Sequence, residues 1–113
     1  MWSISGFKQL KLEIASYESS CFEDLRIFAF QVIRQIRELT NERGEVKNDF
    51  YRAYMNVVIL PSLADMEVFV RDSELHEEKI EFKTRSLKYH FNFIIDSCIY
   101  ASMMNYKEKA SSQ

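Results

Sequence analysis

One stretch, residues 79–106, restricts the folds open to this chain more than any other part of the sequence. Mostly apolar residues recur in it at alternating spacings of four and three, which is the pattern of a helix packed against other helices. The members of this row are Ile80, Thr84, Leu87, Phe91, Ile94, Cys98 and Ala101. A helix over 79–106 would span about 42 Å, more than the width of a compact globule of this size. The sequence therefore predicts a long central helix near the C-terminus.

A second row lies roughly 160° around the same helix, at about 100° of rotation per residue. Its members are Phe82, Ser86, Tyr89, Phe93, Tyr100 and Met103. Either the rest of the chain covers this row, or part of it is exposed for a partner, since aromatic residues and methionine are enriched in interface cores. The candidate partner-binding residues are Phe82, Tyr89, Phe93, Tyr100 and Met103, with Tyr89 and Phe93 as the expected anchors.

Two stretches, 4–17 and 80–93, also contain the apolar–polar alternation that is typical of strands. We favour helices for both. A lone strand over 4–17 would have no evident partner, and the alternation over 80–93 changes parity without a turn residue. The chain has only two glycines, and none follows Gly44, so hairpin turns would be difficult to build in the C-terminal half.

The next predicted helix covers residues 20–39, which repeat the same apolar spacing. Ser20 and Glu23 have the spacing of a capping box, in which each side chain bonds to a backbone amide of the first turn. The polar segment 41–48 follows, and Gly44 within it is a candidate helix stop. This segment is the clearest loop in the sequence.

A third helix is expected to start at Asn48 or Asp49, either of which can cap it. Pro61 should kink or end this helix, because proline lacks the amide proton and clashes with the preceding turn. Apolar residues continue to Val70, and the pair Asp72–Ser73 is expected to begin the last helix. The predicted fold is therefore all-α: a four- or five-helix antiparallel bundle with a long central C-terminal helix.

Composition points to a single domain over 1–113, with 47% apolar residues and a polar end, 107–113, that is expected to fray. The net charge of −2 makes nucleic acid an unlikely partner. No signal peptide and no membrane-spanning stretch is indicated. Cys21 and Cys98 lie far apart with no CxxC pattern, which favours two buried, reduced thiols and a cytoplasmic location.

One motif whose side chains could take part in catalysis occurs twice: an arginine followed five residues later by a histidine. The two pairs are Arg71 with His76 and Arg85 with His90. This spacing resembles the Arg-x(4–6)-His signature of HEPN domains, small all-helical proteins of which many are metal-independent ribonucleases. The resemblance implies that the arginine and histidine would act on the scissile phosphate and the 2′-hydroxyl. It covers six residues at either place.

Other signals of catalysis are lacking in the sequence. There is no glycine-rich phosphate loop, no G-x-S-x-G nucleophile motif and no metal-ligand cluster, so we expect no metal and no cofactor. The leading hypothesis is a small non-catalytic protein that acts through contacts with another protein and forms a homodimer. Its role would be that of a regulator, an adaptor or an inhibitor, such as an immunity or phage-encoded inhibitor protein. The alternative is a HEPN-like ribonuclease that uses one of the Arg-x4-His pairs.

Overall fold

The computed structural model describes residues 4–41, 49–71 and 79–111, and within these segments the chain is helical and has no strand. The elements are α1 (Ile4–Ser16), the 3₁₀ turn η1 (Ser19–Cys21), α2 (Phe22–Asn41), α3 (Asp49–Tyr54), the π-helical turn η2 (Met55–Ile59), α4 (Leu60–Arg71) and α5 (Ile80–Ser111). The all-α prediction is confirmed. The helical interpretation of 4–17 and 80–93 is confirmed with it.

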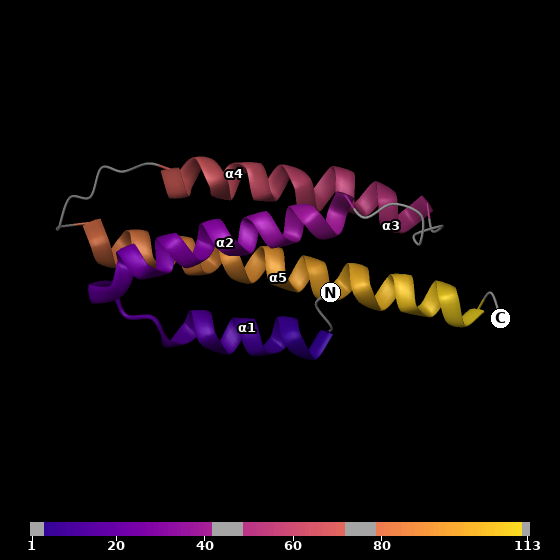
Figure 1. Ribbon diagram of the computed structural model, residues 1–113, viewed down its shortest axis with the longest axis horizontal. Coiled ribbons are helices and arrows are strands. Elements are labelled where there is room, and N and C mark those ends of the chain that lie inside the picture. Colours follow the sequence, from indigo (N-terminus) through magenta and orange to yellow (C-terminus); the bar gives the residue numbers. More distant parts are fainter. Residues whose placement is uncertain (1–3, 42–48, 72–78, 112–113) are drawn as a thin grey trace.

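The helices form an elongated antiparallel bundle, 54 × 23 × 17 Å in extent. Figure 1 shows α1, α2, the α3–α4 segment and α5 running side by side in alternating directions, with α5 along the whole length of the molecule. At 32 residues α5 is about 48 Å long. The length predicted for the last helix is therefore accommodated by an elongated bundle.

The core forms around the inner face of α5. From Thr84 onward, every member of the first row has at most 5% of its surface exposed. The other helices contribute matching apolar rows, with fully or nearly fully buried Ile14, Leu25, Ile36, Ile59, Leu63 and Met66. The first row is thus the central strip of the core, as its spacing predicts.

Pro61 does not end the third helix. Residues 49–71 form one uninterrupted helical run, and the irregularity is the π-helical turn η2 just before the proline. In this turn the Leu60 amide bonds to the Met55 carbonyl, five residues back. The wider turn interrupts the regular ladder of hydrogen bonds where a residue without an amide proton can be accepted. The Ser62 hydroxyl then donates to the Val58 carbonyl at 2.7 Å.

The start of α2 also differs from the prediction. The turn η1 precedes it, and α2 begins at Phe22 rather than at the predicted cap. Glu23 does not complete a capping box, because its carboxylate accepts from the Arg26 guanidinium at 2.7 Å. The prediction of two buried thiols is wrong for Cys21, which is exposed in this turn, and correct for Cys98.

Two cations from neighbouring helices bond to backbone carbonyls at the C-terminal ends of helices. Lys88 on α5 donates to the carbonyls of Ala15 and Tyr17 at the end of α1. Arg26 on α2 donates through Nε to the Val70 carbonyl at the end of α4, at 2.7 Å. Such carbonyls have no partner within their own helix, and the negative end of the helix dipole favours a cation. These contacts fix α1 to α5 and α2 to α4.

Some predictions concern residues outside the described segments. These are the helix stop at Gly44, the cap at Asn48 and the helix start at Asp72–Ser73. At its far end α5 continues to Ser111, five residues beyond the predicted limit of 106. Fraying of 107–113 remains a prediction.

Candidate functional site

The large residues of the second row of α5 are all exposed. Its large residues are Phe82 (63% exposed), Tyr89 (72%), Phe93 (49%), Tyr100 (45%) and Met103 (44%). We call these five residues the outer row. They extend over 22 residues of helix, with about 32 Å between the first and the last. Of the two outcomes left open by the sequence, exposure rather than coverage by the rest of the chain is therefore observed.

Neighbouring helices support the outer row from both sides. On the α1 side, Lys11 forms an ion pair with Asp96 of α5 at 2.7 Å. On the other side, the ring of Tyr100 lies 5.2 Å from that of Tyr54 on α3. Each of these contacts joins α5 to a different helix. The outer row therefore lies on a supported face of the bundle and not on an isolated helix.

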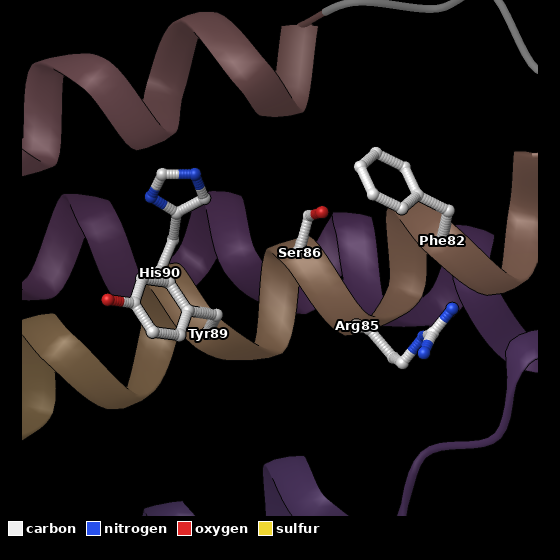
Figure 2. A pocket seen from close by; sticks show the side chains of 5 residues that line it. All are labelled: Phe82, Arg85, Ser86, Tyr89 and His90. Carbon is white, nitrogen blue, oxygen red and sulfur yellow. The ribbon is translucent and has the colours of Figure 1, made fainter.

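The N-terminal half of the outer row borders an open groove of about 480 Å³. Among the described residues, those that line it come from α5: Phe82, Arg85, Ser86, Tyr89 and His90. Figure 2 shows these side chains spread along the exposed surface of the helix. Among these described residues, the rings of Phe82 and Tyr89 supply the apolar part of the groove, and Arg85, Ser86, His90 and the Tyr89 hydroxyl supply its polar groups. A surface of aromatic rings with interspersed polar groups is of the kind found in protein–protein interfaces.

The Arg85–His90 pair is not arranged as a joint site. In Figure 2 the two side chains point to opposite sides of α5, with His90 directed towards α4 and Arg85 away from it. The imidazole instead packs on the rings of Phe69, at 5.5 Å, and Tyr89, at 6.2 Å. A phosphate held by Arg85 would therefore not lie beside the imidazole of the same chain in this conformation.

The other Arg-x4-His pair is described only in part. Arg71 is the last residue of α4, and its guanidinium forms an ion pair with Glu67 at 2.6 Å. Arg37 of α2 pairs with the same carboxylate at 2.5 Å. His76 lies outside the described residues. Arg71 therefore has a structural partner on its own helix.

Groups suited to metal binding or thiol chemistry are few. Among the described residues there is no cluster of three or more His, Cys, Asp or Glu side chains that could hold a metal ion. Burial raises the pKa of the Cys98 thiol to about 12, so this thiol stays protonated and unreactive near neutral pH. The thiol of the exposed Cys21 lies 3.9 Å from the Ser20 hydroxyl.

Sequence reasoning missed a second exposed apolar strip, on the outer side of the α3–α4 run. Its large members are Phe50 (50% exposed), Val57 (73%) and Val68 (72%). Their spacing was visible in the sequence, but the expected break at Pro61 concealed it. The run Asp49–Arg71 is long and apolar enough to cross a membrane by length and composition, although core helices of bundles have the same properties. Its other side, with Ile59, Leu63 and Met66, is fully buried within the bundle.

These features define a small elongated helical bundle with an aromatic outer face. In comparisons with known protein families, curated proteins and solved structures, none matches this chain. The function is therefore inferred from the residues and geometry of this chain alone.

Proposed function

We propose that this protein is a non-catalytic binding protein that acts through contacts with another protein molecule, and that the outer row is its contact surface. The observation that carries the proposal is the exposure of all five residues of the row, between 44% and 72%. Large apolar side chains gathered on one face of a helix are typical of interaction sites. The role would be that of a cytoplasmic regulator, adaptor or inhibitor that forms a homodimer.

The size of the exposed surface supports this proposal. A large aromatic side chain has roughly 150–250 Å² to bury, so the outer row still exposes on the order of 500 Å². A stable protein interface buries about 800 Å² on each partner. The outer row would supply more than half of such an interface. Flanking residues such as Arg85 and Asp96 would supply part of the remainder.

The support of the row by its neighbours favours the same conclusion. Ordering a long side chain on binding costs roughly 0.5–1.5 kcal/mol, so side chains held before binding cost less. Tyr100 is packed on Tyr54, and Tyr89 lies against His90. Aromatic residues held in this way are suited to act as anchors of an interface.

The proposal is tested by the double variant Tyr89→Ala, Phe93→Ala. We expect the wild-type protein to keep the mass of a dimer by light scattering over a tenfold range of concentration. The variant should shift towards monomer, because anchor residues each contribute on the order of 2 kcal/mol or more to an interface. Val68→Ala is a matched control, since Val68 is as exposed as Tyr89 but lies on α4. If the double variant keeps both the oligomeric state and the capture of any partner, the proposal fails.

The HEPN-like ribonuclease remains the alternative hypothesis, with Arg85 and His90 or Arg71 and His76 as its candidate residues. The opposed directions of Arg85 and His90 do not favour it. Cleavage of RNA in the presence of EDTA, abolished by His90→Ala or His76→Ala, would support it over the binding protein.

A further inference from the structure

The outer row contains a symmetry that its exposure alone does not explain. Ser86 and Asp96 fill the two gaps in the row, so that its first six positions are Phe82, Ser86, Tyr89, Phe93, Asp96 and Tyr100. The spacings are four, three, four, three and four. The residue types run aromatic, polar, aromatic, aromatic, polar, aromatic. Both the spacing and the types read the same in either direction about the level of Phe91.

A surface with this symmetry is self-complementary under a two-fold axis. In a two-fold interface, if residue i contacts residue j of the other subunit, then j contacts i in return. Alternating spacings of four and three are also the pattern by which two helices interlock along a seam. Resting on the proposed function, we propose that the outer row binds a second copy of this chain, with the two α5 helices antiparallel and the two-fold axis at the level of Phe91.

This register matches each of these six positions with a suitable partner. Phe82 would pack on Tyr100 of the partner subunit. Tyr89 would pack on Phe93 of the partner subunit, beside the axis. The Ser86 hydroxyl would donate to the carboxylate of Asp96 of the partner subunit. Aromatic side chains therefore meet aromatic side chains, and the two polar positions meet each other.

Charge favours the antiparallel direction. Arg85 and Asp96 lie on the same flank of the exposed face, 11 residues apart, or about 16 Å along one helix. In the antiparallel pair, Arg85 of each subunit lies within about one residue, along the helix axis, of Asp96 of the partner subunit. The two-fold axis therefore produces this pair of opposite charges twice. A parallel pairing would instead place Asp96 against Asp96 of the partner subunit, which is destabilising.

The surroundings of Asp96 are compatible with this additional cation. Its carboxylate already accepts from Lys11 at 2.7 Å, yet its side chain is 58% exposed. A carboxylate has two oxygens and about four acceptor positions, so it can also accept from an arginine and a serine. Lys11, Arg85 and Ser86 would then share this carboxylate across the interface.

The test uses charge reversal at the two positions of the proposed ion pair. Arg85→Asp alone and Asp96→Arg alone each place like charges together twice, and each should weaken self-association about tenfold or more. An equal mixture of the two variants should form heterodimers, because both cross-subunit pairs then join opposite charges. Arg34→Asp, on the exposed face of α2, is the matched control and should dimerise as the wild-type protein does. Solution mass by light scattering measures all four samples.

A disulfide test does not depend on charge. In a Cys21→Ser background, Ser86→Cys together with Asp96→Cys should give a covalent dimer on a non-reducing gel. Either cysteine alone should not, because each would lie about ten residues, or roughly 15 Å, from its own copy along the helix axis. Circular dichroism should show unchanged helix content in all variants.

The outcomes separate the register from the proposed function. A dimeric wild-type protein whose single reversals dimerise normally, or whose mixture stays monomeric, overturns the antiparallel register and leaves the proposed function in place. A monomeric wild-type protein would show that the outer row does not bind a second copy of this chain. The proposed function then also fails if Tyr89→Ala, Phe93→Ala leaves the capture of a foreign partner unchanged.

Discussion

The outer faces of α2 and α5 differ, although both helices bury an apolar row inside the same bundle. On α2 the core residues include Leu25, Val32 and Ile36, and on α5 they include Leu87, Phe91 and Ile94, all with at most 2% exposure. Facing outward, α2 presents mostly charged or amide side chains: Glu23, Asp24, Gln31, Arg34, Gln35 and Glu38. α5 presents the outer row. One buried face is enough to fix a helix in this bundle, so the core of the chain does not require the second apolar face of α5.

The difference extends to the neighbours of these helices. The outer side of α1 is mainly polar, with exposed Lys8, Gln9 and Glu13, whereas the α3–α4 run exposes Val57 and Val68. Among the described residues, the outer faces of α1 and α2 are thus mainly polar, each with one large apolar side chain exposed, Leu12 (67%) and Ile27 (51%), whereas α5 exposes the five large residues of the outer row. Several exposed apolar side chains gathered on one helix face are characteristic of a binding face, whereas single exposed ones are ordinary.

The largest expected effect distinguishes the inner from the outer face of α5. Phe91→Ala should lower the free energy of unfolding by about 3–5 kcal/mol, because it leaves a cavity in the core. Tyr89→Ala, two residues away but 72% exposed, should cost less than about 1 kcal/mol. Urea unfolding at concentrations where the protein is monomeric measures both values. Equal costs would mean that the outer row belongs to the core.

A second prediction concerns the thiol on the inner face. Burial raises the pKa of Cys98 from 9.0 to about 12, so between these values the folded protein keeps a proton that the unfolded chain loses. Unfolding then releases a proton, and stability should fall with rising pH at a slope that approaches about 1.4 kcal/mol per unit. Below pH 9 this contribution is fully present.

Cys98→Ala provides the comparison for that slope, since both proteins share the titration of their tyrosines and lysines. The difference between wild type and variant should therefore shrink as the pH rises from 9 to 12. Chemical unfolding at several pH values measures it. A difference that stays constant over this range would show that the thiol is accessible to water.

The smallest expected effect is on the outer face of α2. Gln31→Ala and Arg34→Ala should each change the free energy of unfolding by less than about 0.5 kcal/mol, because both side chains are exposed. Neither should change the solution mass. A loss of self-association in either variant would place the interface on α2 and remove the contrast with α5.

Local features of the sequence predicted some of the site and missed other parts. The five residues of the outer row were identified from helical spacing alone, and all five are exposed, while their role in binding stays a prediction. The opposed directions of Arg85 and His90 were not foreseen, because a linear motif does not specify rotamers. Of the two outcomes expected at Pro61, a kink or an end, the end is wrong, and the π-helical turn before the proline was not foreseen because proline propensity takes no account of such a turn.

The sequence by itself determined that the chain is helical and that α5 has two apolar faces, because the helical period places residues three and four apart on one side. Only the tertiary structure decided which of these faces the protein buries. That choice depends on how many helices are available to pack around α5. In the described residues, contacts from α1, α2, α3 and α4 reach the inner face and the flanks of α5 but leave the outer row exposed.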